Sequence, residues 1–347
     1  MQPIKTAILS FGMSGKLFHA PFIDVHPGFD FYAVWERSKN LAQEKYPNVK
    51  TYRTLEELLA DGAIELVIVN TPNYTHYEYT KSALEAGKHV IVEKPFTVSV
   101  AQGEELIALA KKRNAKLSVY HNRRYDSDFK VVRKMVTEGW LGEIVEAEFH
   151  FDRYKEELSP KVHKETPGPG TGALYDLGSH LIDQALQLFG MPQAIFADVQ
   201  VMRPISKVDD YFELLFYYPG KRVRLKSSYL VREPLPGYVL HGTKGSFIKP
   251  KTDVQEMALM EGKIPGTNDW GKEPEGEKGL LHTEKEGKVI KEYTPCFQGN
   301  YLEYFDGVYE AIRNNKTVPV EAQDAVNVIR IIEVAFQSTK EKRVIEF

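Results

Sequence analysis

The sequence predicts a two-domain α/β protein, in which a doubly wound, mostly parallel sheet precedes an α+β domain with a large, mostly antiparallel open sheet. Strand and helix signals alternate through the first 120 residues, which is typical of a parallel α/β sheet. From about residue 144, strand-like segments follow one another directly. The chain of 347 residues is also longer than one ordinary core needs, so we expect domains over 1–121 and 122–347.

The predicted strands of the first domain are dense in Val, Ile, Leu, Phe and Tyr, as suits strands that are covered on both faces. They lie over 6–11, 29–35, 65–70, 89–93 and 116–120. Helical stretches lie between them over 54–60, 76–86 and 100–114. The second of these helices stops before Gly87, a residue that readily takes the left-handed conformation at helix ends.

In the second domain, several predicted strands alternate in polarity, which indicates a sheet with one solvated or interface face. The strands are expected over 144–152, 194–202, 211–218, 222–229 and 238–241. Helices are expected over 128–139, 173–189, 301–314 and 322–339. The stretch 251–295 is rich in Gly, Lys and Glu around an isolated Trp270, and we expect a long surface excursion that could reach the cleft.

The bulk composition excludes several classes of partner. A formal net charge of -3 leaves no basic footprint for nucleic acid and no polybasic membrane arm. No apolar run is long enough to span a bilayer, and a strand follows the amino terminus without a signal-like segment. A single cysteine, Cys296, fits a reducing compartment. We therefore expect a cytoplasmic protein.

A glycine-rich turn follows the first strand. It matches the dinucleotide-binding (Rossmann) fingerprint, with serine in place of the first glycine. Gly12 would let the backbone approach a pyrophosphate, and Gly15 would let the next helix pack closely on the strand. The phosphates would lie on the amide groups at the helix start. The residues expected there are Ser10, Phe11, Gly12, Met13, Ser14 and Gly15.

The residues at the end of the second strand are expected to bind the adenosine ribose of the cofactor. Glu36 could bind the ribose hydroxyls and favour NAD, whereas Arg37 and Ser38 suit the 2′-phosphate of NADP. These residues leave the choice between the two cofactors open. The carboxyl ends of later strands add cofactor candidates in Thr71, Pro72, Asn73, His76 and Asn122.

The motif Glu93-Lys94-Pro95 lies where the buried strand over 89–93 ends. Parallel α/β sheets bind their ligands beyond the carboxyl ends of the strands. A lysine at this place, followed by proline, therefore points to a role toward a ligand.

A second polar cluster lies on the helix over 173–189. Asp176, His180, Asp183 and Gln187 follow one another at helical spacing, opposite an apolar side. A solvated face usually carries lysine and glutamate, which this helix lacks. A carboxylate one turn before an imidazole suits acid–base chemistry near neutral pH. A metal site is not expected, because no HExxH motif and no paired cysteines occur.

Together, Glu93-Lys94-Pro95, the glycine-rich turn and Asp176-x-x-x-His180 resemble the Gfo/Idh/MocA family of NAD(P)-dependent oxidoreductases. The likeness covers essentially the whole chain and is closest to the NADP-dependent scyllo-inositol dehydrogenase branch. It implies a polyol or sugar as substrate, and it favours NADP, which Glu36 opposes. It also implies a homodimer or homotetramer formed through the second sheet.

The resemblance further implies roles for single residues. Lys94 would lie between the nicotinamide and the substrate and hydrogen-bond the reacting oxygen, and the bond from Lys94 to Pro95 would be cis. Glu93 and Lys94 would both help to bind the cofactor. His180 would take the hydroxyl proton, with Asp176 holding it or the substrate in place. The substrate contacts implied are Lys94, Asn122, Arg123, Tyr154, Asp176 and His180.

Two other functions remain open at this point. The same cofactor cradle could serve a glycosidase that oxidises its sugar transiently with bound NAD, or a non-catalytic NAD(P)-binding sensor. A sensor would need none of the three residues Lys94, Asp176 and His180, and their presence favours the reversible dehydrogenase.

Overall fold

The computed structural model describes residues 2–347, except for the side chain of His163, and divides into two compact units. The first unit comprises the chain up to Asn122 together with 255–270 and 300–326. The second comprises 123–254, 271–299 and 327–347. Segments distant in the sequence therefore complete each unit.

The first unit is built on a six-stranded parallel sheet in the order β3-β2-β1-β4-β5-β6. Its strands are β1 (Ile4–Ile8), β2 (Phe29–Trp35), β3 (Lys50–Tyr52), β4 (Leu66–Val69), β5 (His89–Glu93) and β6 (Leu117–Tyr120). The three-residue edge strand β3 was not predicted, because Lys-Thr-Tyr carries no apolar run. All four residues of β4 and all four of β6 are buried. The doubly wound sheet predicted from the alternating pattern is confirmed.

Short helices and turns connect these strands. They are η1 (Gly15–His19, a π-helical turn), α1 (Ala20–Val25), α2 (Leu41–Lys45), α3 (Leu55–Ala60), η2 (Asn73–Thr75), α4 (His76–Glu85), α5 (Val100–Lys112), α9 (Val254–Met260) and α10 (Leu302–Arg313). Thr54 caps α3 in a reciprocal capping box with Glu57. Gly87, just after α4, has φ 75°, as the terminator predicted there requires.

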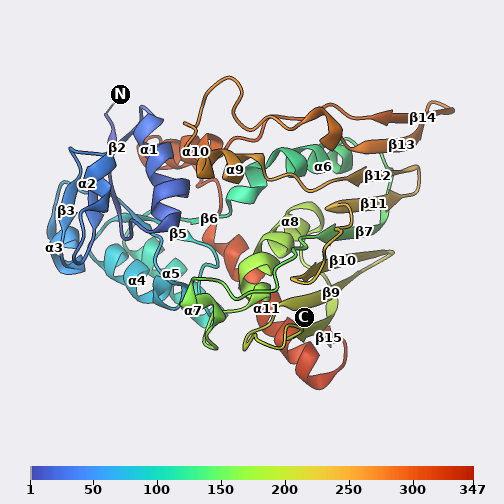
Figure 1. Ribbon diagram of the computed structural model, residues 1–347, viewed down its shortest axis with the longest axis horizontal. Coiled ribbons are helices and arrows are strands. Elements are labelled where there is room, and N and C mark those ends of the chain that lie inside the picture. Colours follow the sequence, from blue (N-terminus) through green and yellow to red (C-terminus); the bar gives the residue numbers. More distant parts are fainter. Residues whose placement is uncertain (1) are drawn as a thin grey trace. The chain divides into compact units, whose positions relative to one another are not determined.

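The second unit is built on a nine-stranded sheet in the order β14-β13-β12-β11-β7-β10-β9-β8-β15, whose strands other than β8 are labelled in Figure 1. The strands are β7 (Ile144–His150), β8 (Ala194–Gln200), β9 (Tyr211–Tyr218), β10 (Lys221–Ser228), β11 (Tyr238–Gly242), β12 (Gly245–Lys249), β13 (Leu280–Lys285), β14 (Lys288–Tyr293) and β15 (Ile345–Glu346). Among the described strand pairs, β7 and β10 run parallel and the others antiparallel. This confirms the predicted mostly antiparallel sheet.

One face of this sheet forms the core of the second unit. Residues of β9 alternate strictly between half-buried and buried. The buried face includes Phe149, Phe212, Phe216, Leu225 and Leu240, all with 0% exposure. The remaining helical elements are η3 (Asn122–Tyr125), α6 (Ser127–Thr137), α7 (Val162–Glu165), η4 (Leu174–Gly178), α8 (Ser179–Phe189), η5 (Glu275–Glu277) and α11 (Ala322–Glu341).

The prediction of a surface excursion over 251–295 is wrong for much of that stretch. Strands β13 and β14 extend the nine-stranded sheet as a hairpin, and Trp270 is only 3% exposed, with its indole against Phe22. The hairpin looked like a loop because β14 is the edge strand. Five of its six residues are exposed, so its sequence shows no apolar alternation.

No helix among the described residues is long and apolar enough to cross a membrane.

Candidate functional site

The turn between β1 and η1 is as tight as the glycine pattern predicts. The amide of Gly12 donates to Ser10 Oγ at 3.3 Å, and the amide of Lys16 donates to the Gly12 carbonyl at 3.0 Å. A Cβ on Gly15 would lie 2.1 Å from the Ser10 carbonyl oxygen, so residue 15 must be glycine for the helix to start this close to the strand. Ser10, which stands in place of the first glycine of the fingerprint, therefore accepts a hydrogen bond within the turn through its hydroxyl.

The other residues of this turn differ in their surroundings. Phe11 is buried, with its ring 6.3 Å from that of Phe31, so its side chain belongs to the core. Met13 is 43% exposed. The Ser14 hydroxyl donates to Glu93 Oε1 at 2.6 Å and so links the turn to the end of β5.

Glu36 has a structural role that the sequence did not reveal. Its two carboxylate oxygens accept the amides of Leu41 and Ala42, each at 3.1 Å, at the start of α2. The residue is 7% exposed, whereas Arg37 and Ser38 are exposed. Any contact between Glu36 and a ribose would have to compete with both of these hydrogen bonds.

The loop after β4 is closed by its own side chains. The hydroxyls of Thr71 and Thr75 lie 2.6 Å apart, and Thr75 Oγ1 also donates to the Pro72 carbonyl at 2.6 Å. Asn73 begins the η2 turn that leads into α4. His76, the first residue of α4, has 0% exposure and lies with Nε2 2.9 Å from the Thr71 carbonyl oxygen.

The Glu93-Lys94-Pro95 motif directly continues β5, and the cis peptide bond expected between Lys94 and Pro95 is present. Glu93 accepts a hydrogen bond from Ser14, and His19 Nε2 lies 2.8 Å from the same oxygen, Oε1. Burial raises the pKa of the Glu93 carboxyl, but the hydrogen bonds from His19 and Ser14 and the charge of Lys94 outweigh it and hold this pKa at about 2. Glu93 is therefore a carboxylate at neutral pH, next to the lysine.

In the second unit, the predicted polar line begins in the π-helical turn η4 and continues along α8. His180 is 5% exposed, and its ring lies 6.4 Å from that of Phe151. Asp176 is half-buried, and each of its carboxylate oxygens accepts a hydrogen bond from Lys164 Nζ at 2.9 Å. Gln187, two turns of α8 beyond His180, is exposed.

Asp183 lies deeper in the second unit than a solvated face would allow. Its carboxylate accepts two hydrogen bonds from Arg124, at 2.6 and 2.9 Å, and both side chains are almost fully buried. This ion pair holds α8 against the η3 turn and thereby supports the helix that carries His180.

Arg123 takes part in a buried charge cluster. Its guanidinium lies 2.7 Å from Asp253, 3.2 Å from Asp126 and 5.0 Å from the centre of the Phe151 ring. Burial raises the pKa of Asp126 to about 7, against the opposing charge of Arg123. The predicted substrate contact therefore already has two carboxylate partners within its own unit. Asn122, just before it, is 7% exposed.

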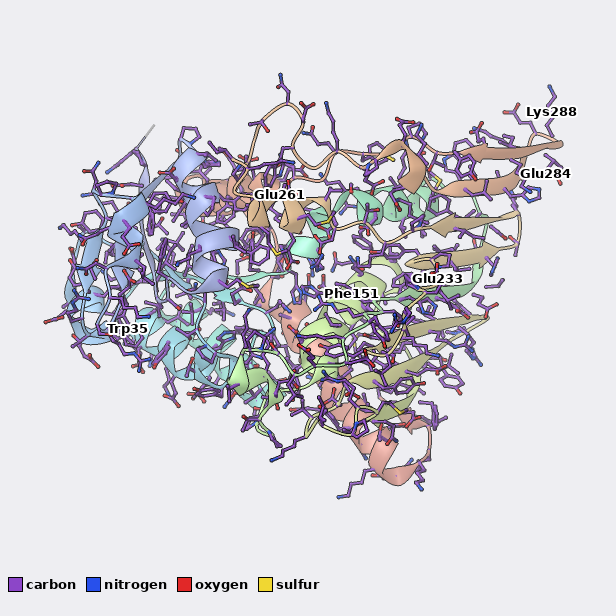
Figure 2. The ribbon with its side chains drawn as sticks, in the orientation of Figure 1. Trp35, Phe151, Glu233, Glu261, Glu284 and Lys288 are labelled. Carbon is purple, nitrogen blue, oxygen red and sulfur yellow. The ribbon has the colours of Figure 1, made fainter. Side chains whose placement is uncertain are left out.

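A pocket of 460 Å³ lies at the carboxyl end of β7 in the second unit. Phe151, which Figure 2 labels, contributes to its lining together with His150, Asp152, Lys251 and Glu277. Tyr154 lies a few residues further along, 40% exposed and beneath the guanidinium of Arg232 at 4.0 Å.

Sequence reasoning missed three residues, of which two contact predicted site residues and one lines the pocket. Lys164 comes from the four-residue helix α7, which has no periodicity to reveal it. Lys251 lies in the stretch taken for an excursion, with Nζ 4.8 Å from the centre of the Phe151 ring. His19 could have been found, because a histidine within the apolar run Leu17-Phe18-His19-Ala20 is expected to need a buried partner. Among the described residues, no group of three His, Cys, Asp or Glu side chains could hold a metal ion.

Comparison with known proteins identifies the family. Residues 4–121 match the model for the NAD-binding Rossmann fold of an oxidoreductase family, and residues 133–347 match the model for its C-terminal alpha/beta domain. The chain belongs to the Gfo/Idh/MocA family. As a Gfo/Idh/MocA protein, it is an NAD(P)-dependent oxidoreductase that acts on CH–OH groups. The glycine-rich turn after the first strand and the tight approach at Gly15 fit a dinucleotide.

Full-length relatives support this assignment. The Gfo/Idh/MocA chain is 41% identical to scyllo-inositol 2-dehydrogenase (NADP(+)) IolW of Bacillus subtilis, over 99% of this chain and 95% of that protein. It is 31% identical to D-glucoside 3-dehydrogenase of Escherichia coli over 55% of each chain. A solved oxidoreductase structure from Bacteroides fragilis has a TM-score of 0.92 and 48% identity over 100% of both chains.

Proposed function

We propose that this protein is a reversible dehydrogenase that moves a hydride between NADP and a secondary alcohol of a cyclic polyol or sugar. The observation that carries the proposal is the position of Lys94, directly after β5 and next to a carboxylate that is hydrogen-bonded to the glycine-rich turn. The 41% identity to a scyllo-inositol dehydrogenase over nearly the full length supports the class of substrate.

In this proposal, the glycine-rich turn from Ser10 to Gly15 would hold a nicotinamide dinucleotide, which would supply the acceptor or donor of the hydride. The Lys94 ammonium hydrogen-bonds the reacting oxygen and stabilises its developing negative charge. His180 takes the hydroxyl proton. Asp176 holds His180 or a neighbouring substrate hydroxyl, and its ion pair with Lys164 keeps the carboxylate in place.

We choose NADP as the cofactor because of the burial and hydrogen bonding of the residues that follow β2. The Glu36 carboxylate, which would repel a 2′-phosphate, is buried and occupied by two backbone amides of α2. Arg37 and Ser38 are exposed beside it. A guanidinium and a hydroxyl are suitable donors for a phosphate.

The pocket at the end of β7 supports a polar, ring-shaped substrate. The Phe151 ring supplies an apolar surface, while Asp152, Lys251 and Glu277 supply charged groups. Small-molecule pockets combine an apolar surface with a few polar groups that fix the orientation of the ligand. The contact between the rings of Phe151 and His180 connects this pocket to the proposed base.

The test follows reduced-nicotinamide absorbance with NAD⁺ and NADP⁺ in parallel, against inositols, pyranoses and glycosides. We expect reduction of NADP⁺ by one polyol or sugar. Lys94→Ala should lower turnover by more than about 100-fold while cofactor binding survives. Near-normal turnover in this variant would contradict the role of Lys94. Release of sugar from a glycoside without free reduced cofactor would identify the glycosidase instead.

The cofactor choice has its own test. Arg37→Ala should raise the KM for NADP by about 10–100-fold and leave that for NAD unchanged, since it removes charge-assisted hydrogen bonds to the 2′-phosphate. Lys45→Ala, which removes a neighbouring exposed cation from α2, is the matched control. Glu36→Gln should leave the NADP/NAD ratio unchanged. A shift toward NADP in Glu36→Gln would show that this carboxylate reads the ribose after all.

We also infer a homodimer or homotetramer formed through the open face of the nine-stranded sheet. That face carries a run of charged side chains, in which Arg224 pairs with Glu148 and Glu213. Light scattering on the intact protein tests this inference, and a monomer at micromolar concentration would contradict it.

A further inference from the structure

Lys94 lies between two residues that are each bound by a buried histidine. On its amino-terminal side, the Glu93 carboxylate lies 2.8 Å from His19 Nε2. On its carboxyl-terminal side, the Pro95 carbonyl oxygen lies 2.8 Å from His76 Nδ1. The two histidines come from different elements, η1 and α4.

His19 is fixed in place by its neighbours. Its side chain has 0% exposure, and its ring lies 4.6 Å from that of Tyr120 and 6.5 Å from that of Phe305. The Glu93 oxygen that faces it also accepts the hydroxyl of Ser14, while the other oxygen accepts the amide of Lys94 at 3.2 Å. The glycine-rich turn, His19 and the backbone of Lys94 therefore meet at one carboxylate.

His76 plays a similar part on the other side. Its two ring nitrogens face the carbonyl oxygens of Pro95 and Thr71, at 2.8 and 2.9 Å. A neutral ring can donate to either carbonyl, and a protonated ring donates to both. Because Thr71 belongs to the loop after β4, His76 connects that loop to the loop that carries Lys94.

We propose that His19 and His76 are positioning residues that fix the backbone on both sides of Lys94 and couple it to the glycine-rich turn and the loop after β4. This rests on the proposed function, in which Lys94 contacts the reacting oxygen. A displacement of about 1 Å in such a group can cost about 100-fold in rate. Packing alone would not require a hydrogen-bond donor at either ring.

Positioning by hydrogen bonds and simple packing can be distinguished by variants that keep the ring but lose its hydrogen bonds. His19→Phe and His76→Phe keep an aromatic ring and remove the hydrogen bonds. His19→Gln offers an amide donor to Glu93. His26→Phe is the matched control, because His26 also makes two ring hydrogen bonds in the first unit, to the Gly28 amide and to Asp306.

The first measurement needs neither substrate nor cofactor. Lysines are reductively methylated with ¹³C, and the Lys94 signal is assigned by its absence in Lys94→Arg. We expect His19→Phe and His76→Phe to shift or broaden this signal, and His19→Gln and His26→Phe to leave it near the parent position. An unchanged signal in both Phe variants would overturn the proposal, whatever the protein's substrate is.

The second measurement uses the substrate found in the absorbance screen. In His19→Phe, kcat should fall by about 10–100-fold with little change in the KM for substrate, and His19→Gln should recover most of the loss. His26→Phe should match the parent enzyme. If His19→Phe does not fold, Ser14→Ala is the alternative variant, because it removes the other hydrogen bond to the same Glu93 oxygen. Its kcat should fall below that of the parent enzyme, by less than the roughly 10–100-fold expected for His19→Phe. Equal losses in His19→Gln and His19→Phe would indicate packing and refute the positioning role.

Discussion

Replacing Arg124 with methionine should destabilise the second unit by about 3–5 kcal/mol, the usual cost of removing one partner from a buried ion pair. The Arg124 guanidinium donates two hydrogen bonds to Asp183, at 2.9 and 2.6 Å. The side chains are 7% and 3% exposed, so water cannot replace the lost donor. Coulomb's law supports this magnitude, since two charges about 4 Å apart attract by about 4 kcal/mol at an effective dielectric constant of about 20.

A double-mutant cycle isolates the pair. Arg124→Met and Asp183→Leu should each be strongly destabilising, because each removes two charge-assisted hydrogen bonds from a charged group that stays buried. The double variant should recover about 2 kcal/mol or more relative to the sum of the two single variants. Arg133→Met, at an exposed position of α6, is the control and should change stability by less than about 0.5 kcal/mol.

Urea unfolding followed by circular dichroism and tryptophan fluorescence is the assay. Trp140 belongs to the second unit, whereas Trp35 and Trp270 belong to the first, so Trp140→Phe identifies the transition of the second unit. A loss below about 1 kcal/mol in Arg124→Met, or exact additivity of the two single variants, would refute the reasoning. Because α8 also carries His180, the same variant should lower turnover even at temperatures where it stays folded.

Two further predictions concern titrating groups. The Glu93 pKa is held at about 2, below its ordinary value of 4.5, so this carboxylate should contribute about 3 kcal/mol of stability above pH 4.5 that is lost as the pH falls toward 2. The stability difference between the parent and Glu93→Gln, measured by urea unfolding at several pH values, should therefore shrink over that range, and a constant difference would contradict it. Burial, with a hydrogen bond to Glu273, raises the pKa of the Cys296 thiol to about 11 from 9.0, so alkylation by iodoacetamide at pH 8 should be about 100-fold slower in the native protein than after unfolding. Equal rates, followed by mass spectrometry, would show that the thiol is not protected.

The periodic parts of the chain could be predicted well from the sequence. Strands β2, β5 and β9 have the predicted bounds, because each combines a dense apolar pattern with clear turn residues at its ends. The short edge strands β3 and β15, the edge hairpin of β13 and β14, and β12 beside that hairpin were missed. Edge strands bury less surface, so their sequences carry less of the pattern on which such predictions rely.

The sequence by itself determined the alternation of the central strands and helices in the first unit, the glycine-rich turn and the lysine at the end of β5, because these depend on residues close together in the chain. Tertiary structure alone decided which partners the charged residues take. It paired Asp183 with Arg124, and it brought Ser14 and His19 to Glu93. A buried charge must find its partner in space, often far away along the chain, and no local pattern records that choice.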